Sequence, residues 1–349
     1  MGLVGNEIDI GECMLDIGKP LLRTWPEDCF LTSIIQGQEH AYDWIMNSFV
    51  QICAYKFDKK KGTMRISFYP EGKHHFRINL YDLCPFISKY VVDNKWLNGV
   101  FNNFSDFAMY TLSNGYYLSV VLDQFYRSDT AGKHIIHPVY IYGYNAQKKV
   151  IYTADSYMAG RYTYMEVAFE HINEAFESIN VNCNVAYDHK TYMYQVEPKT
   201  YKFSMEHLVC LLEDYLNAKD STNYEYRNAG RCFGVKSYDV FLNYIDYIIE
   251  SRQSELDLRS FVFLVDYHCM MEWRMEYLIE KGYLAETERD LAASARALKE
   301  SSENTLNIAI KYVLKQNLDC LVAARENIRK ICQQNIEITE KLLGKIKSR

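Results

Sequence analysis

Apolar and polar residues alternate in two neighbouring stretches in the middle of the chain. Between residues 139 and 144, apolar or small residues take turns with tyrosines, and after the polar segment 145–148 the pattern resumes over 150–153. Such alternation in β-branched and aromatic residues, interrupted by a few polar ones, is typical of a β-hairpin. The pattern predicts two antiparallel strands, with His137 at the start of the first and Asp155 at the end of the second.

His137 and Asp155 stand at the open end of this predicted hairpin. In an antiparallel pair the start of one strand lies next to the end of the following strand, so the two side chains are expected to be neighbours. A histidine beside a carboxylate is the arrangement of a general base and the acid that orients it. The hairpin lacks a nucleophile, so another part of the chain must supply one.

Helical periodicity marks an earlier stretch of the chain. From Phe30 onward apolar residues recur at helical spacing, and Pro26 and Asp28 stand just before them, as residues at helix starts do. Gly37 is expected to bend or break this helix. Cys29 is therefore predicted at or beside a helix N-terminus, where unpaired N–H groups and the helix dipole lower the pKa of a thiol. The alternative is that Cys29 is a small buried core residue.

The remainder of the first 200 residues mixes strand and helix signals. The periodicity and the turn residues predict a hairpin formed by 63–69 and 75–81, helical or irregular segments over 81–90 and 93–107, a strand over 116–123, a loop over 128–133 and a helix over 164–178. Helices combined with hairpins indicate the α+β class.

Helical patterns dominate from about Phe203, and proline is absent after Pro198. The predicted helices span residues 205–218, 238–252, 258–281, 285–314 and 318–346. Ser204 and Ser237 are expected to cap the first two, and the last two are expected to form an antiparallel helical hairpin. The sequence thus predicts a catalytic domain over 1–200 and a helical domain over 201–349.

Charge and composition narrow the classes of partner. The formal net charge of −6 argues against a nucleic-acid binder, and no stretch approaches the roughly 18 apolar residues that a membrane span needs. The N-terminus lacks the pattern of a secretory signal. The ten cysteines include no CxxC pair, which argues against a zinc site and fits free thiols in a reducing compartment. We therefore expect a cytoplasmic protein without nucleic-acid or membrane partners.

A cysteine at a helix start, then a histidine, then an aspartate is the order found in papain-like cysteine hydrolases. Residues from about 20 to 180 resemble that fold and, more narrowly, the bacteriocin-processing peptidase-like group and the butirosin-type acyltransferases. Those families carry a pattern H-x-V-x-V-x-G-Y followed by V-x-V-x-D. It is matched here by His137, Val139, Ile141, Gly143 and Tyr144, and then by Val150, Tyr152 and Asp155.

The sequence departs from the papain-like pattern in two respects. Arg23 stands about where those peptidases carry a glutamine that helps to hold the oxyanion, so backbone N–H groups around Cys29, or the arginine itself, are the candidate substitutes. A helical part follows the catalytic part, whereas the bacteriocin processors are joined to transporters. This combination is more similar to the soluble acyltransferases of antibiotic biosynthesis, which include papain-like enzymes that form amide bonds on carrier-bound chains.

The resemblance implies an acyl or peptidyl transferase with Cys29, His137 and Asp155 as its triad. Cys29 would take an acyl chain from the phosphopantetheine thioester of an acyl or peptidyl carrier protein and pass it to an amine acceptor, as in nonribosomal peptide biosynthesis. This chemistry needs no cofactor and no metal. Two alternatives remain open: a cysteine peptidase or thioesterase that uses the same triad, and a non-enzymatic binding protein on the same scaffold.

Some other residues are weaker candidates. His134 is an alternative base, and Asp123 and Asp129 are alternative carboxylates. Basic residues near the C-terminus are candidates for docking an acidic carrier protein, although the neighbouring glutamates also fit an ordinary solvated helix face. These basic residues are Arg325, Arg329, Lys330, Lys341, Lys345, Lys347 and Arg349.

Overall fold

The chain folds into two compact units. The computed structural model describes residues 11–55, 57, 64–71, 79–126, 134–157, 161–182, 189–222, 230–253 and 255–348. The first unit consists of residues 1–41, 73–77 and 81–200, and the second of residues 42–72, 78–80 and 201–349. Residues 42–72 therefore fold with the helical part, whereas the division made from the sequence placed them with the catalytic residues.

The first unit is built on an antiparallel sheet with the strand order β4-β9-β5-β6-β7-β8, and β1 also pairs with β6. The strands are β1 (Glu12–Met14), β4 (Ile87–Asp93), β5 (Tyr116–Asp123), β6 (Ile136–Asn145), β7 (Val150–Tyr157), β8 (Arg161–Ala168) and β9 (Lys190–Val196). The predicted central hairpin is confirmed, because β6 and β7 pair in antiparallel fashion with Tyr140 opposite Ala154.

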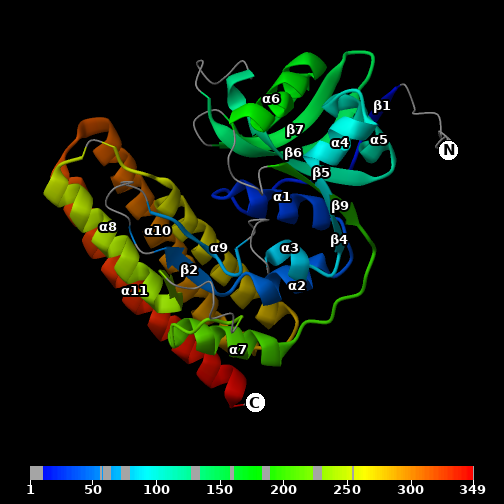
Figure 1. Ribbon diagram of the computed structural model, residues 1–349. Helices are drawn as coiled ribbons and strands as arrows, with labels where there is room; N and C mark the ends of the chain where they lie inside the picture. The colour runs from blue at the N-terminus through cyan, green and yellow to red at the C-terminus, as the bar shows by residue number, and fades with distance from the viewer. Residues whose placement is uncertain are drawn as a thin grey trace. The chain divides into compact units, whose positions relative to one another are not determined.

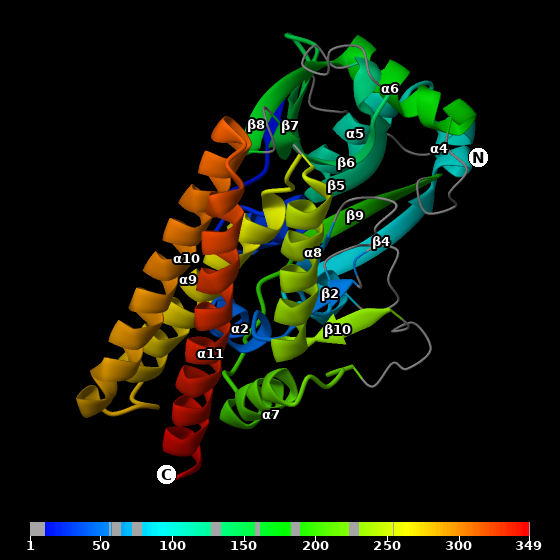
Figure 2. The same cartoon turned by 90° about the vertical axis from the view of Figure 1, so that its left-hand side faces the viewer.

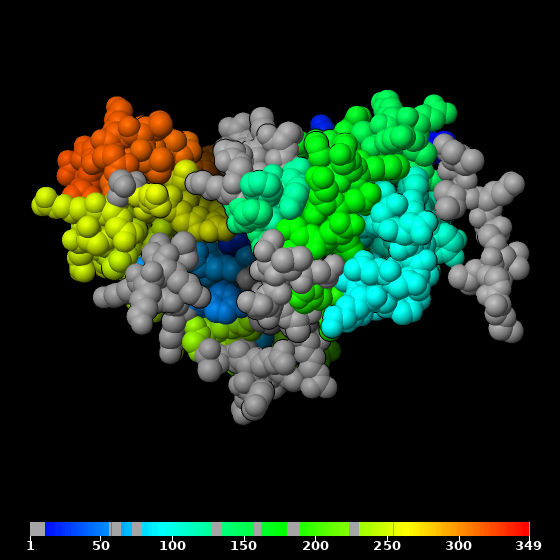
Figure 3. Space-filling view, turned by 45° about the horizontal axis from the view of Figure 1, so that its top comes forward, coloured from blue at the N-terminus to red at the C-terminus, as the bar shows by residue number. Residues whose placement is uncertain are grey.

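Helices cover both faces of this sheet (Figure 1). They are α1 (Pro26–Ile35), α3 (Leu80–Leu83), α4 (Asn94–Val100), α5 (Phe104–Ser113) and α6 (Phe169–Asn182). The core between the sheet and helices α5 and α6 includes Val139, Ile141 and Ile151. Tyr140, which lies between two of these residues, points to the opposite face and stacks on Phe30 of α1, with ring centroids 4.5 Å apart. In the space-filling view the surfaces of α4 and α5, in cyan, and α6, in green, lie side by side (Figure 3).

The glycine of the H-x-V-x-V-x-G-Y pattern has a steric role. Gly143 pairs with Met14 of β1, and a Cβ atom at position 143 would lie 2.6 Å from the carbonyl oxygen of Cys13 and 2.9 Å from the ring of Tyr152. No side chain fits this space. The close approach of β1 to β6 therefore depends on a residue without a Cβ atom.

The second unit combines a small antiparallel sheet with long helices. The sheet has the order β10-β2-β3, formed by β2 (Ile52–Tyr55), β3 (Ile66–Phe68) and β10 (Arg231–Phe233). The helices are α2 (Ala41–Ser48), α7 (Met205–Leu216), α8 (Ser237–Ser251), α9 (Arg259–Glu280), α10 (Arg289–Lys315) and α11 (Leu318–Lys347). Figure 2 shows α10 and α11 along one another, so the helices and the helical hairpin predicted beyond residue 203 are confirmed.

Long-range contacts explain why residues 42–72 belong to this unit. Arg274 of α9 is fully buried and donates hydrogen bonds to the carbonyl oxygens of Met46 and Phe49, at 2.8 and 2.7 Å, at the end of α2. Burial lowers the pKa of Arg274 to about 10. The Asn47 side chain bonds to the backbone of Ser204 on both its N–H and its carbonyl oxygen. Such bonds join residues more than 150 positions apart, and local sequence patterns do not reveal them.

Several local predictions were wrong. The helix expected over 164–178 starts only at Phe169, because β8 occupies residues 161–168 and pairs with β7. Part of the segment 81–90 forms β4, which pairs with β9. The predicted hairpin of 63–69 with 75–81 is not observed within the described residues: β3 pairs with β2, Leu80 and Tyr81 belong to α3, and 72–78 lie outside the description.

The two predicted serine caps differ in outcome. Ser204 does cap α7, since its Oγ accepts the backbone N–H of His207 at 3.1 Å. Ser237 instead lies inside the first turn of α8, whose N-cap position is Lys236, and its hydroxyl donates to the carbonyl oxygen of Cys232. A short 3₁₀ turn over Gly234–Lys236 precedes α8 and displaces the cap.

The helices of the second unit enclose an uncharged histidine. His268 is fully buried on α9, with Nδ1 2.8 Å from the Ser302 hydroxyl and Nε2 3.4 Å from the Tyr238 hydroxyl. Ser302 donates its own proton to the carbonyl oxygen of Leu298, so it accepts from Nδ1–H of the imidazole. Burial lowers the pKa of His268 to about 3. The folded protein therefore holds His268 neutral at pH values where the unfolded chain protonates it.

We expect this difference to make the protein acid-sensitive. Below its ordinary pKa of about 6.5, His268 binds a proton only in the unfolded state, so stability falls as the pH is lowered, by about 1 to 2 kcal/mol between pH 6.5 and 5. Urea unfolding at both pH values should show that His268→Gln removes about this much of the loss. His171→Gln, at an exposed position of α6, serves as the control. An unchanged pH dependence in His268→Gln would contradict the prediction.

Candidate active site

Cys29 lies in the first turn of α1, as predicted. The helix begins at Pro26, and the backbone N–H of Cys29 donates to the carbonyl oxygen of Trp25 at 2.9 Å. The side chain is 0% exposed, and its Sγ lies 3.0 Å from the carbonyl oxygen of Leu22, to which the thiol donates. The sulfur is therefore enclosed by the protein in this structure.

His137 and Asp155 form the expected pair. Nδ1 of His137 lies 3.1 Å from Oδ2 of Asp155 and 2.9 Å from the carbonyl oxygen of Pro138. Asp155 is fully buried, and it also accepts hydrogen bonds from the Gln124 side chain at 3.3 Å and from the backbone N–H of Ser156 at 2.6 Å. Both carboxylate oxygens are thus held, and the imidazole is fixed through Nδ1. The other ring nitrogen, Nε2, lies on the opposite edge of the imidazole from these two contacts.

The surroundings favour the charged form of His137. Burial by itself would lower the pKa of the imidazole, but the charge and hydrogen bond of Asp155 outweigh burial and raise the pKa above its ordinary value. The charge of Glu27, in the first turn of α1, acts in the same direction. The surroundings therefore stabilise an imidazolium. The hydrogen bonds of His137 go to Asp155 and Pro138, and that of the Cys29 thiol goes to Leu22.

Helix α1 packs against the strand that carries Asp155. α1 contacts β7, Phe30 stacks on Tyr140 of β6, and the Tyr81 hydroxyl donates to the carbonyl oxygen of Glu27 at 2.7 Å. Burial raises the pKa of Tyr162 on β8, and the charges of Cys29 and Asp155 act in the same direction. One tyrosine hydroxyl is therefore coupled electrostatically to both residues.

The alternative base and one alternative carboxylate form a pair of their own. Nδ1 of His134 lies 2.7 Å from Oδ2 of Asp123, which also accepts from the Ser178 hydroxyl at 2.8 Å. Burial would raise the pKa of Asp123, but the hydrogen bonds from His134, Phe125 and Ser178 lower it. His134 also stacks on the ring of Phe125 at 4.2 Å. Both residues thus have separate partners, and Asp129 lies outside the described residues.

Other predicted residues have less distinctive surroundings. Arg23 is exposed, unlike the buried residues that follow it in α1. Among the residues that the structure describes, no three or more His, Cys, Asp or Glu side chains are grouped to hold a metal ion. In the same part of the chain, none of the helices combines the length and apolar character needed to cross a bilayer.

The basic residues proposed for docking are largely paired with carboxylates. Arg325 pairs with Asp246 and Glu326, Arg329 also pairs with Glu326, Lys345 with Glu288 and Lys347 with Glu213. Arg349 lies outside the described residues. These ion pairs weaken the positive surface that the count of basic residues suggested.

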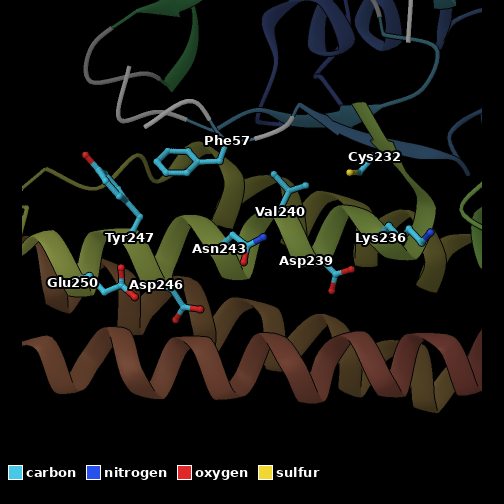
Figure 4. Close-up of a pocket in the computed structure, with 9 residues that line it drawn as sticks. All are labelled: Phe57, Cys232, Lys236, Asp239, Val240, Asn243, Asp246, Tyr247 and Glu250. Atoms are coloured by element: carbon cyan, nitrogen blue, oxygen red, sulfur yellow. The ribbon is translucent and has the colours of Figure 1, made fainter. Parts of the chain in front are cut away.

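A pocket in the second unit was not anticipated from the sequence. It has a volume of about 590 Å³ and lies beside α8, with Phe57, Cys232 and Tyr247 among its lining residues. Figure 4 shows the side chains of Asp239 and Asp246 directed to the other side of the helix from Phe57. Since Asp246 is paired with Arg325, the carboxylates do not converge on a common centre.

Comparison with known proteins adds no assignment: no protein-family model matches the chain, and neither does any curated protein. The site is therefore interpreted from its own geometry.

Proposed function

We propose that the first unit is a cysteine-dependent acyltransferase with a papain-like core, in which Cys29 is the nucleophile, His137 the base and Asp155 the residue that orients it. The observation that carries the proposal is the 3.1 Å contact between His137 and the buried Asp155 on paired strands. The packing of α1 against β7 supports it, because the helix start that carries Cys29 belongs to the same unit.

The reaction follows from these roles. His137 takes the proton of the Cys29 thiol, and the thiolate attacks the carbonyl carbon of an acyl thioester on a carrier protein. The tetrahedral adduct collapses, the carrier thiolate leaves and takes the proton from the imidazolium, and an acyl-enzyme remains. An amine then attacks the acyl-enzyme, His137 accepts its proton and returns it to the Cys29 sulfur, and an amide is released. Asp155 stabilises the imidazolium in both halves.

Exclusion of water separates such a transferase from a hydrolase that uses the same triad. The full burial of Cys29 supports the transferase, since a thioester formed there is shielded from bulk water. The scheme is similar to that of the closthioamide-pathway peptidyl transferase, a papain-like protein that makes amide bonds on carrier-bound chains. The helical unit is assigned to docking the carrier or covering the acyl chain.

The test offers the protein an acyl-carrier thioester together with an amine and follows both products by mass spectrometry. Amide should be the main product, and binding of the carrier should weaken at raised salt because charge pairing is screened. Free acid as the only product, whatever amine is offered, would assign the triad to a thioesterase or peptidase. Absence of both products and of an acyl-enzyme would favour a binding protein.

A further inference from the structure

Three buried hydroxyl groups beside Asp155, those of Ser156, Tyr162 and Thr163, lack a hydrogen bond of good geometry among the described residues. These hydroxyls are shielded from solvent. The Ser33 hydroxyl lies close enough to that of Tyr162 to lower its pKa, although burial outweighs this effect. Leaving a buried polar group unsatisfied is unfavourable and uncommon in folded proteins. Such groups are often reserved for a ligand or a reacting atom, so their position relative to the proposed triad decides their meaning.

The strand register places the hydroxyls of Tyr162 and Ser156 on the face of the sheet that α1 covers, whereas Thr163 pairs with Asp155 and points to the other face. Tyr162 of β8 pairs with Ser156 of β7, which directly follows Asp155. Alternate residues of a strand point to the same side, so Ser156 shares a face with Ala154. Ala154 is opposite Tyr140, the residue on which Phe30 of α1 stacks.

Hydrogen bonds connect this face to the turn that carries Cys29. The ring of Tyr164 contacts that of Tyr162 edge-on at 5.9 Å, and its hydroxyl donates to the carbonyl oxygen of Gly18 at 2.9 Å. The N–H of Gly18 donates to the carbonyl oxygen of Ser33, and the Ser33 hydroxyl donates to the carbonyl oxygen of Cys29 at 2.7 Å. Tyr162 therefore stands next to the segment that surrounds the proposed nucleophile.

The Tyr162 hydroxyl is suited to donate a proton in a hydrogen bond. Burial, and after it the charge of Cys29, raises its pKa above the ordinary value, so it stays protonated at neutral pH. A buried donor gains most when negative charge develops near it, because the surroundings have a low dielectric constant. The exposed Arg23, at the position where papain-like peptidases carry glutamine, lacks this setting.

We propose that the Tyr162 hydroxyl, with that of Ser156 beside it, donates a hydrogen bond to the oxyanion formed during acyl transfer to Cys29; this rests on the proposed function. When the thiolate forms the C–S bond, the carbonyl π electrons move to oxygen, and the new charge receives the Tyr162 hydrogen bond. When the carrier thiolate leaves, the carbonyl re-forms and the hydroxyl is released. The substrate class is an acyl thioester whose carbonyl oxygen points to β7 and β8.

Tyr162→Phe tests the assignment, because it removes only the hydroxyl. The kcat for amide formation should fall about 10²-fold, as on loss of an oxyanion donor. Alkylation of Cys29 by iodoacetamide, followed by peptide mapping, should keep its rate, since substitution at a methylene carbon forms no oxyanion. The melting temperature should not fall, because the hydroxyl makes no hydrogen bond of good geometry that the substitution would remove.

Tyr164→Phe is the matched control on the same face of the same strand. It removes a hydroxyl that is already bonded to Gly18, so it should lower stability while kcat stays within about threefold of the parent. Unchanged kcat in Tyr162→Phe, with an active parent protein, would overturn this inference alone. A parallel fall in kcat and in alkylation rate would also overturn it, since the effect would lie on the thiol. An inactive parent that forms no acyl-enzyme would instead overturn the proposed function.

Discussion

Replacing Cys29 with alanine is expected to abolish amide formation, with a loss of at least about 10³-fold. The acyl chain must form a bond with the enzyme before the amine attacks, and alanine offers no atom for it. Two other buried cysteines do not stand at the start of a helix as Cys29 does: burial raises the pKa of Cys84 to about 12, and burial, together with the charge of Glu71, raises the pKa of Cys53. Neither thiol forms a thiolate readily at neutral pH.

The measurement is the mass of the intact protein after exposure to an acyl-carrier thioester without amine. One acyl adduct should appear and map to the peptide that contains Cys29. Cys84→Ala, which removes another buried thiol of the same unit, should retain both the adduct and the activity. An adduct on the exposed Cys210, with Cys29 unmodified, would contradict the assignment of the nucleophile.

Removing the base is expected to cost more than changing the carboxylate that orients it. In His137→Ala no group remains to take the proton of the thiol or of the amine, and kcat should fall about 10⁴-fold, the upper range for a general base. In Asp155→Asn the amide oxygen still accepts from Nδ1 of His137, and some papain-like enzymes use asparagine. Loss of the charge from that hydrogen bond should cost about 10- to 100-fold.

The pH dependence gives a second readout for Asp155. Its charge and hydrogen bond raise the pKa of His137, whereas burial lowers it. Asp155→Asn should therefore move the pKa of His137 down, and the acid limb of the pH–rate profile should shift to lower pH. His134→Ala, which affects the separate pair with Asp123, should keep kcat within about threefold. Equal losses in His134→Ala and His137→Ala would show that the base has been misassigned.

Local patterns determined the elements that carry the proposed triad. The alternation around residues 139–153 specified the β6–β7 hairpin, and with it the neighbourhood of His137 and Asp155, because side-chain period and turn position need only nearby residues. The same holds for Cys29 in the first turn of α1 and for the long helices beyond residue 203. The periodicity of a helix or a strand can be recognised in a stretch of about 11 to 18 residues, without knowledge of distant parts of the chain.

Tertiary structure decided what depends on distant partners. The sequence pattern predicts a helix from residue 164, whereas 164–168 belong to β8, because only the pairing with β7 distinguishes this segment from the start of α6. Residues 42–72 belong to the helical unit, to which they are joined by hydrogen bonds such as those of Arg274. The fold also places His134 within hydrogen-bond distance of Asp123. Nothing in the sequence identifies the Tyr162 hydroxyl as buried and without a hydrogen bond of good geometry, because this property depends on which side chains the fold places around it. Sequence periodicity indicates which face of an element is buried, but it does not identify the groups that meet there.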